Sequence, residues 1–288
     1  NFAPMQQLSF VPLHQWGHRL RTTLPLLFFT IIALLTSCDH VFDVHPYDMN
    51  ISGEHNINAT NITKIQSICE DKDTIRFAVI SDSHLYLTDL ADQVKDINRR
   101  DSIDFVIHLG DLTETGTTKE FDWSRGELQK LNKPYVALIG NHDFLGTGDQ
   151  LYKWMYGEHN FSFIVNGIKF VALDTNAMEY DHMAAVPNFT YMENEATVGT
   201  TPFARTVVMM HAAPYSDEFN NNVSKAFDYY VRQFPGLMFC LYGHDHQDTI
   251  RDIFNNGVIY YGINSSNHRT YHIFTINPDG YEQQQINL

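Results

Sequence analysis

Short apolar runs alternate with amphipathic segments along the first half of the chain's main body. Runs of β-branched and aromatic residues predict buried strands over Ile75–Ser81, Phe105–Leu109 and Tyr135–Ile139. Between them, apolar residues on one face predict a helix over Leu87–Asn98, and a second helix is predicted over Lys119–Leu131. Strands that alternate with helices in this way favour a parallel sheet with right-handed crossovers.

After residue 160 the pattern changes towards antiparallel strands. Phe161–Val165 and Ile168–Leu173 are predicted to form a hairpin around an Asn-Gly turn. Further apolar runs predict two strands with a helix between them, over Thr206–Met210, Val223–Phe234 and Leu237–Tyr242. The tail alternates turns with predicted strands, at Thr249–Phe254, Val258–Ile263 and Tyr271–Ile276. We therefore expect one α/β domain whose sheet is closed off by antiparallel strands.

The first 37 residues have the pattern of an export signal. Two arginines, Arg19 and Arg21, precede the uncharged apolar run Leu24–Leu35. This run is shorter than the about 20 residues that a membrane-spanning helix needs, and it fits the apolar region of a signal peptide. The sequence Leu-Thr-Ser-Cys that ends at Cys38 resembles the lipobox of bacterial lipoproteins. The resemblance implies a diacylglycerol lipid on Cys38 and a chain anchored at the cell envelope, facing the periplasm or the cell surface.

Residues 39–73 are polar and rich in Asn and Asp. This composition predicts a tether, with one short ordered piece near Ile62–Ile68. The expected organisation is a signal peptide over 1–37, a polar tether over 38–73 and one catalytic domain over 74–288.

The overall composition sets limits on the partners of the protein. The chain has 288 residues, of which 43% are hydrophobic, and this is enough apolar material for a full core. The formal net charge is −15, and such an acidic body repels nucleic acid, so no nucleic-acid partner is expected.

The three cysteines form no C-x-x-C pair, which argues against a zinc knuckle. Whether Cys69 and Cys240 form a disulfide stays open.

Residues that commonly bind metals follow five of the predicted strands. In chain order they are Asp82, His84, Asp111, Asn141, His211, His244 and His246. The carboxyl ends of strands in an open α/β sheet line the ligand crevice, so we expect these side chains to converge. Carboxylate, amide and imidazole groups are ligands that borderline divalent metals accept.

This set of side chains is large enough for two metal ions. One ion would take Asp82, His84 and His246, the other would take Asn141, His211 and His244, and Asp111 would bridge them. Two ions about 3.5–4 Å apart can clamp a phosphoryl group and lower the pKa of a shared water. Gly110, Gly140 and Gly243 each precede a predicted ligand and suit turns that pass close to the metals.

The motifs D-x-H, G-D, G-N-H-[DE], H and G-H-x-H occur in this order across Asp82–His246. Together they resemble the calcineurin-like metallophosphoesterase superfamily. The resemblance implies an α/β sandwich in which helices flank two central mixed β-sheets. It also implies that the seven side chains bind metal and that a hydroxide shared by two metal ions hydrolyses a phosphomonoester or phosphodiester. His142 would contact the phosphate and the leaving oxygen, and Asp143 would hold the His142 ring.

Departures from the family patterns narrow these expectations. Glu114 stands where purple acid phosphatases carry a metal-bound tyrosine, which argues against an Fe(III)–tyrosinate centre. The two divalent ions are expected to be Mn, Fe, Zn or Mg, and the substrate is expected to be a small-molecule or lipid phosphoester.

The loop Tyr215–Phe219, which follows His211, is a candidate part of the wall of the substrate site. The alternative hypothesis is a non-catalytic binding module at the cell surface on the same fold.

Overall fold

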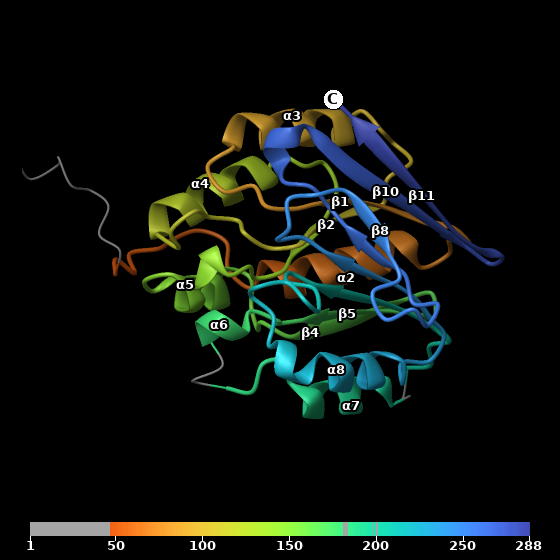
Figure 1. Ribbon diagram of the computed structural model, residues 1–288. Coiled ribbons are helices and arrows are strands. Elements are labelled where there is room, and N and C mark those ends of the chain that lie inside the picture. Colours follow the sequence, from red (N-terminus) through yellow and green to blue (C-terminus); the bar gives the residue numbers. More distant parts are fainter. Residues whose placement is uncertain (1–46, 181–183, 198, 200) are drawn as a thin grey trace, which may run out of the picture. The chain divides into compact units, whose positions relative to one another are not determined.

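The computed structural model describes residues 47–288, apart from 181–183, 198 and 200, and contains two packed β-sheets (Figure 1). The predicted signal peptide over 1–37 and the lipidation site Cys38 lie outside the described residues. Within the described part, no helix combines the length and the apolar character that a membrane crossing requires.

The first sheet has the strand order β11-β10-β1-β2-β3. Strands β1, β2 and β3 run parallel, as the sequence predicts, while β10 pairs antiparallel with both β1 and β11. The bounds are β1 (Ile75–Ile80), β2 (Phe105–His108), β3 (Tyr135–Ala137), β10 (Thr270–Asn277) and β11 (Gly280–Asn287).

The second sheet has the strand order β4-β5-β6-β7-β9-β8. Its four central strands are parallel, and the edge strands β4 and β8 pair antiparallel with their neighbours. The bounds are β4 (Phe161–Val165), β5 (Ile168–Leu173), β6 (Arg205–Met210), β7 (Leu237–Tyr242), β8 (Thr249–Arg251) and β9 (Tyr260–Gly262). The two mixed sheets confirm the predicted α/β sandwich.

Helices cover the outer face of each sheet (Figure 1). The first sheet packs against α3 (Leu87–Asn98), α4 (Thr118–Leu128) and α5 (Gly148–Met155). The second sheet packs against α7 (Phe189–Ala196) and α8 (Ser224–Val231). The remaining short elements are α6 (Ala177–Tyr180) and the 3-10 turns η1 (His142–Phe144), η2 (Asn221–Val223) and η3 (Ser266–His268).

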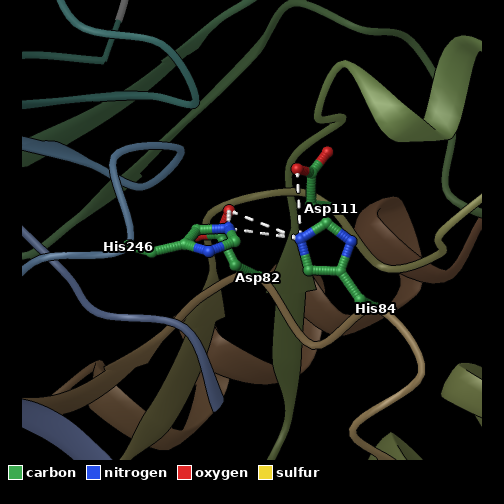
Figure 2. Close-up of side chains that lie close together, drawn as sticks. All are labelled: Asp82, His84, Asp111 and His246. Atoms are coloured by element: carbon green, nitrogen blue, oxygen red, sulfur yellow. Dashed lines mark hydrogen bonds and ion pairs between the residues drawn. The ribbon is translucent and has the colours of Figure 1, made fainter. Parts of the chain in front are cut away.

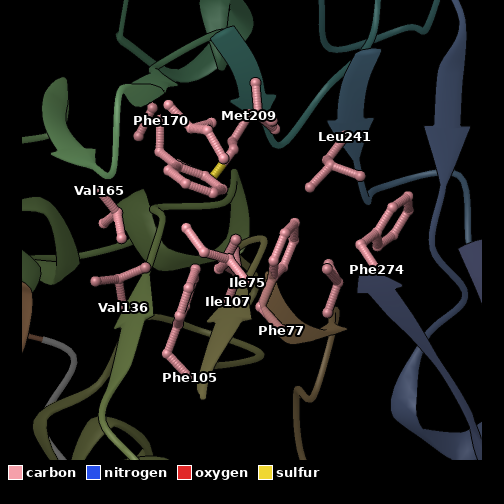
Figure 3. Close-up of a cluster of buried hydrophobic side chains, with 14 of the residues drawn as sticks. Ile75, Phe77, Phe105, Ile107, Val136, Val165, Phe170, Met209, Leu241 and Phe274 are labelled. Atoms are coloured by element: carbon pink, nitrogen blue, oxygen red, sulfur yellow. The ribbon is translucent and has the colours of Figure 1, made fainter. Parts of the chain in front are cut away.

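The main hydrophobic core lies between the two sheets (Figure 3). Alternate residues of β1 point to opposite faces, so Phe77 and Val79 enter this core while Ala78 and Ile80 pack under the outer helices. The ring of Phe77 meets the ring of Phe170 from the other sheet edge to face, with the ring centroids 5.4 Å apart. This aromatic contact joins the two layers.

Helix α2 (Ile57–Cys69) closes one side of the sandwich, because it packs against the edge strands β3 and β4 of the two sheets. Asn58 exchanges two hydrogen bonds with the backbone of Ala137, both 2.9 Å long. Asn61 donates to the carbonyl of Tyr135 over 2.8 Å. The ordered piece predicted near Ile62–Ile68 lies within this helix, which extends further in both directions than predicted. The asparagines that suggested a tether satisfy the free backbone groups of an edge strand.

The two cysteines in the described part are separate buried thiols. Cys69 lies at the end of α2 and Cys240 lies in β7. Burial raises the pKa of Cys69 to about 11 and also raises the pKa of Cys240. Neither thiol is therefore an activated nucleophile, and the two do not form a disulfide.

Candidate metal centre

The predicted ligands follow strands of both sheets and meet at their carboxyl ends. In the first sheet they follow β1, β2 and β3, and in the second sheet they follow β6 and β7. The structure brings all seven side chains together, namely Asp82, His84, Asp111, Asn141, His211, His244 and His246. The site therefore lies at the seam between the two layers of the sandwich.

Four of these side chains form a first group (Figure 2). The Nε2 atoms of His84 and His246 lie 3.3 Å apart. Nε2 of His246 is 3.2 Å from Oδ1 of Asp82, and Nε2 of His84 is 3.5 Å from Oδ2 of Asp111. Each residue offers one ligand atom, and these four atoms all lie within 4.8 Å of one another. This is the arrangement expected of residues that share one ion.

A second group forms on the other side of Asp111. Oδ2 of Asp111 is 3.3 Å from Nε2 of His211. Oδ1 of Asn141 lies 3.0 Å from the same nitrogen of His211 and 3.1 Å from Nδ1 of His244. These four residues are Asp111 and the three that the sequence assigns to the second ion.

Asp111 belongs to both groups. Its Oδ2 faces His84 on one side and His211 on the other. Its Oδ1 accepts a hydrogen bond from the backbone N–H of His142 over 2.9 Å, which fixes the orientation of the carboxylate. This position agrees with the bridging role that the sequence predicts for Asp111.

The buried carboxylates need positive charge. Asp82 and Asp111 have exposed fractions of 0% and 1%, and their ion pairs within the described residues are all with histidines. A buried carboxylate without a cation is costly. Nitrogen and oxygen ligands about 2.1 Å from a common ion lie roughly 3.0–3.4 Å from each other, close to the separations within each group. The residues present therefore fit two divalent metal ions.

The pKa values of the site also indicate that its carboxylates need positive charge nearby. Burial alone would lower the pKa of His211, but Asp111 and Asp82 outweigh it and raise that pKa to about 10. Burial would raise the pKa of Asp82 and of Asp111, yet the neighbouring histidines lower both. The site therefore favours a cation at its centre, whether a proton or a metal ion.

Several predicted ligands have a strained backbone. Asp82, His84, Asp111, His244 and His246 all have positive φ angles, between 40° and 64°. This left-handed region is uncommon for residues other than glycine, and such strain concentrates at functional sites. The turns after β1, β2 and β7 therefore adopt unfavourable conformations in order to aim these side chains at one point.

His142 lies beside the first group. Its Nδ1 is 2.7 Å from the backbone oxygen of Glu114, and because a carbonyl can only accept, this nitrogen carries the hydrogen. The rings of His142 and His84 lie 4.7 Å apart at an interplanar angle of 88°. Burial would lower the pKa of His142, but Asp111 and the carbonyl of Glu114 raise it overall. The ring therefore holds a proton more readily than an ordinary histidine.

Asp143 does not hold the His142 ring, so the predicted role of this residue is corrected. Its carboxylate accepts hydrogen bonds from the backbone N–H groups of Leu112, Thr113 and Gly140 and from the Thr113 hydroxyl. The carbonyl of Glu114 takes the position expected for Asp143. Asp143 instead joins the loop after β2 to the loop after β3, and thereby braces the backbone just after Asp111 and just before Asn141.

Two carboxylates that sequence reasoning missed contact ligand histidines. Oε2 of Glu114 is 3.1 Å from Nδ1 of His84, and Oδ1 of Asp217 is 2.8 Å from Nε2 of His244. Only the contact of His244 with Asp217 is a hydrogen bond, because Nδ1 of His84 makes none within the described residues. Metal-binding histidines commonly donate their second N–H to a carboxylate, which orients the ring. Glu114 could have been found from the sequence, because it lies three residues after Asp111 of the G-D motif. Asp217 lies in a loop without a motif, and its side chain is 95% exposed.

The sequence profile of the calcineurin-like phosphoesterases matches residues 75–248, which is more than half of the chain. The chain belongs to the calcineurin-like phosphoesterase family. It is a metallophosphoesterase whose buried His/Asp cluster fits a site for two metals. No curated protein matches the chain by sequence.

Solved structures share the fold at low sequence identity. GAP50, described as the anchor in the inner membrane complex of Plasmodium, has a TM-score of 0.59 and 12% identity, with 75% of this chain and 85% of that chain covered. A dimetal phosphatase from Danio rerio has a TM-score of 0.51 and 13% identity, with 74% and 98% covered. The purple acid phosphatase PPD1 from yellow lupin seeds has a TM-score of 0.51 and 12% identity, with 74% and 54% covered.

Proposed function

We propose that this enzyme hydrolyses a phosphomonoester or phosphodiester with two divalent ions held by the seven predicted ligands. The observation that carries the proposal is the position of Asp111, whose Oδ2 faces His84 in one group and His211 in the other. When bound in such a site, two ions neutralise phosphoryl oxygens and lower the pKa of a shared water.

The protein's own side chains support the departure of the leaving group. His142 holds a proton that it can give to the leaving oxygen through Nε2, because its Nδ1 is tied to the Glu114 carbonyl. The backbone N–H of His142 also fixes Asp111, so the acid and the bridging ligand keep a constant relative position.

The metal and the substrate are proposed as classes. Imidazole, amide and carboxylate ligands suit Mn, Fe, Zn or Mg according to supply, and Glu114 in place of tyrosine speaks against an Fe(III)–tyrosinate pair. The net charge of −15 speaks against nucleic acid, and a small-molecule or lipid phosphoester remains as the proposed substrate.

The test is metal-dependent cleavage of p-nitrophenyl phosphate and bis-p-nitrophenyl phosphate by protein loaded in turn with each metal. Asp111→Asn should lose at least about 100-fold in rate, or about 2.7 kcal/mol of barrier, because it removes the negative charge of the one side chain that belongs to both groups of ligands. Asp101→Asn, on the exposed surface, is the matched control and should keep full activity. Undiminished cleavage after complete chelation would contradict the proposal.

The non-catalytic binding module remains the second candidate, because GAP50 is described as an anchor. The complete ligand set and His142 favour the enzyme, since a pure binding surface has no need of either. Metal analysis separates the two hypotheses. About two ions per chain together with ester cleavage supports the enzyme, whereas far less than two ions and no cleavage supports the binding module.

We infer that the chain is a bacterial lipoprotein, anchored at the cell envelope through a lipid on Cys38. The support is the basic and apolar pattern that ends in the lipobox-like Leu-Thr-Ser-Cys. Expression of the full chain in a bacterium tests it, with Cys38→Ser as the variant and Cys69→Ser as the control. The wild-type chain and the control should partition with membranes and incorporate labelled fatty acid. Equal membrane partition of Cys38→Ser would contradict the lipid anchor.

A further inference from the structure

His108, the last residue of β2, is a buried histidine that the proposed reaction does not use. It is 0% exposed, and it pairs with Ile80 on one flanking strand and Ala137 on the other. Burial lowers the pKa of its ring to about 4, so the imidazole is neutral at neutral pH. An apolar side chain could fill this space without the cost of burying a polar ring. The hydrogen bonds of His108 therefore need an explanation.

These hydrogen bonds show which ring nitrogen carries the hydrogen. Nδ1 of His108 is 3.3 Å from the backbone nitrogen of Gly110, and because an N–H can only donate, Nδ1 accepts. Nε2 therefore carries the hydrogen and donates to Oγ of Ser83 over 3.0 Å. The Ser83 hydroxyl in turn donates to the backbone carbonyl of Asp111 over 3.5 Å. Both ring nitrogens are occupied by protein groups, so neither is free to bind a metal ion.

The same contacts join two turns that carry three predicted metal ligands (Figure 2). In the turn after β1, Ser83 stands between Asp82 and His84. In the turn after β2, Gly110 directly precedes Asp111. The backbones of the two turns also pair, because the N–H of Asp82 donates to the carbonyl of Gly110 over 3.0 Å. The N–H of His84 likewise donates to the carbonyl of Asp111 over 3.1 Å. The buried ring therefore adds side-chain bonds to a junction that the backbone begins.

The backbone conformations at this junction are unfavourable. The φ angles are 50° at Asp82, 40° at His84 and 54° at Asp111. Residues other than glycine keep such angles only where the surrounding structure determines them. The ring of His108 supplies part of this support, because it makes directional bonds to both turns. A hydrophobic side chain would fill the space without fixing the position of either turn.

We propose that His108 is a positioning residue, whose ring holds the turns after β1 and β2 so that Asp82, His84 and Asp111 face one ion. It acts through Ser83 and the backbone of Gly110. The inference rests on the proposed function, because it requires that these three side chains bind metal.

The experiment measures Mn²⁺ binding to metal-free protein by chelator competition. His108→Phe keeps an aromatic ring and loses both hydrogen bonds. The ion of the first group should bind about 10–100-fold more weakly, the usual effect of losing a residue that orients metal ligands. The ion of the second group should weaken less, because Asp111 is the one member of that group in these two turns.

Conservative variants separate positioning from packing. His108→Gln places an amide N–H near the former Nε2 and can still donate to Ser83, and His108→Asn places an oxygen near the former Nδ1 and can still accept from Gly110. At least one of them should bind the first ion roughly 5-fold more tightly than His108→Phe does, the effect of one restored hydrogen bond. Ser83→Ala breaks the middle of the chain of bonds and should weaken the first ion by a similar factor.

Two control variants show what a merely structural change does. Ser124→Ala removes an equally buried hydroxyl in α4, and it should leave the affinity for both ions unchanged. Val106→Ala leaves a cavity in the same strand as His108. It should lower the melting temperature by a few degrees and leave both affinities unchanged.

The outcomes separate this inference from the proposed function. Wild-type affinity for both ions in His108→Phe and Ser83→Ala overturns the inference, and Ser83→Ala alone decides if His108→Phe does not fold. A loss of affinity that neither His108→Gln nor His108→Asn recovers, or an equal loss in Val106→Ala, also overturns it. A wild-type chain that binds no ion contradicts the metal centre and this inference with it. Two bound ions without cleavage of any phosphoester contradict the hydrolase alone, and the affinities of the variants then still decide the role of His108.

Discussion

Gly140 passes so close to Asp111 that its missing side chain is part of the site. A Cβ atom built on Gly140 would lie 2.2 Å from the backbone nitrogen of Asp111 and 2.2 Å from its Oδ1. Non-bonded heavy atoms approach to about 3.5 Å at best, so the two loops would have to separate by about 1 Å. Gly140→Ala therefore tests whether Asp111 must occupy the position that the structure gives it.

The expected effect on catalysis follows from this displacement. A shift of about 1 Å in a catalytic group costs on the order of 100-fold in rate, or about 2.7 kcal/mol of barrier. The clash also involves backbone, so overpacking should lower the unfolding free energy by about 1–3 kcal/mol. Because Asp111 contacts both groups of ligands, the content of both metal ions should fall together.

Three measurements check this prediction: kcat on p-nitrophenyl phosphate, metal content per chain, and the melting temperature. Gly126→Ala is the matched control, because a Cβ on Gly126 in α4 meets nothing within 4 Å. That substitution should keep activity and raise stability by about 0.5–1 kcal/mol, as expected for glycine in a helix. A folded Gly140→Ala enzyme with wild-type kcat and two ions per chain would refute the close packing of Gly140 on Asp111.

Three other changes have clear expected outcomes. His142→Ala should reduce kcat by about 10²–10⁴-fold with nearly unchanged metal content, because under the proposed function the ring gives a proton to the leaving oxygen and is not a metal ligand; loss of metal would contradict this role. Asp217→Asn should weaken metal affinity by about 10–100-fold in a chelator competition, since Asp217 orients His244. Asp248→Asn should destabilise the fold at neutral pH in urea unfolding. Burial would raise the pKa of Asp248, but hydrogen bonds, first from His272, lower it, so its stabilisation is present above about pH 4 and disappears as the pH falls through the lowered value. If the difference in unfolding free energy between the wild type and Asp248→Asn stayed constant down to acid pH, this would argue against a stabilising role of the ionised Asp248.

Elements with a strong periodic signal were predicted with their correct bounds. The predicted ranges of α3, β4, β5 and β7 coincide with the observed ones. In the tail the apolar run predicted a strand over Thr249–Phe254, but β8 ends at Arg251. Ile253 and Phe254 leave the strand and pack against the cluster under α8. A short apolar run reports burial and does not by itself specify the backbone conformation that achieves it.

The full extent of helix α2, of which only a short ordered piece near Ile62–Ile68 was predicted, was missed for a different reason. Its sequence is polar, and only Ile57, Ile65 and Cys69 of its apolar residues are buried. Part of its attachment comes from Asn58 and Asn61, which bind the backbone of an edge strand. Hydrogen bonds to backbone groups far along the chain leave no periodic pattern in the sequence. A single sequence therefore cannot distinguish these asparagines from those of a flexible linker.

The candidate ligands could be found from the sequence because each follows a strand end. The residues that support them could not be found in this way. Asp217 reaches His244 from a loop with no repeating pattern, and Asp143 makes several backbone contacts that no motif encodes. The expected partnership of Asp143 with His142 came from the family resemblance, whereas the ring is held by the carbonyl of Glu114.

The distribution of ligands over the two sheets connects metal binding to the stability of the sandwich. In the first group three residues follow strands of the first sheet, and only His246 comes from the second. In the second group His211 and His244 follow β6 and β7, opposite Asp111 and Asn141. Each ion would therefore be bound by both layers, at an edge that the apolar core does not reach.

Removal of metal should consequently loosen this edge of the sandwich. Asp82 and Asp111 would lose the cations that compensate their buried charges, and protonated histidines would have to replace them. A ligand that binds only the folded state stabilises it by about 2.7 kcal/mol at 100 times its Kd, so metal should raise the melting temperature in a concentration-dependent way. Amide hydrogen exchange should locate the loosening in the turns after β1, β2 and β7. A melting temperature that is insensitive to metal would show that the ions do not bind between the two sheets.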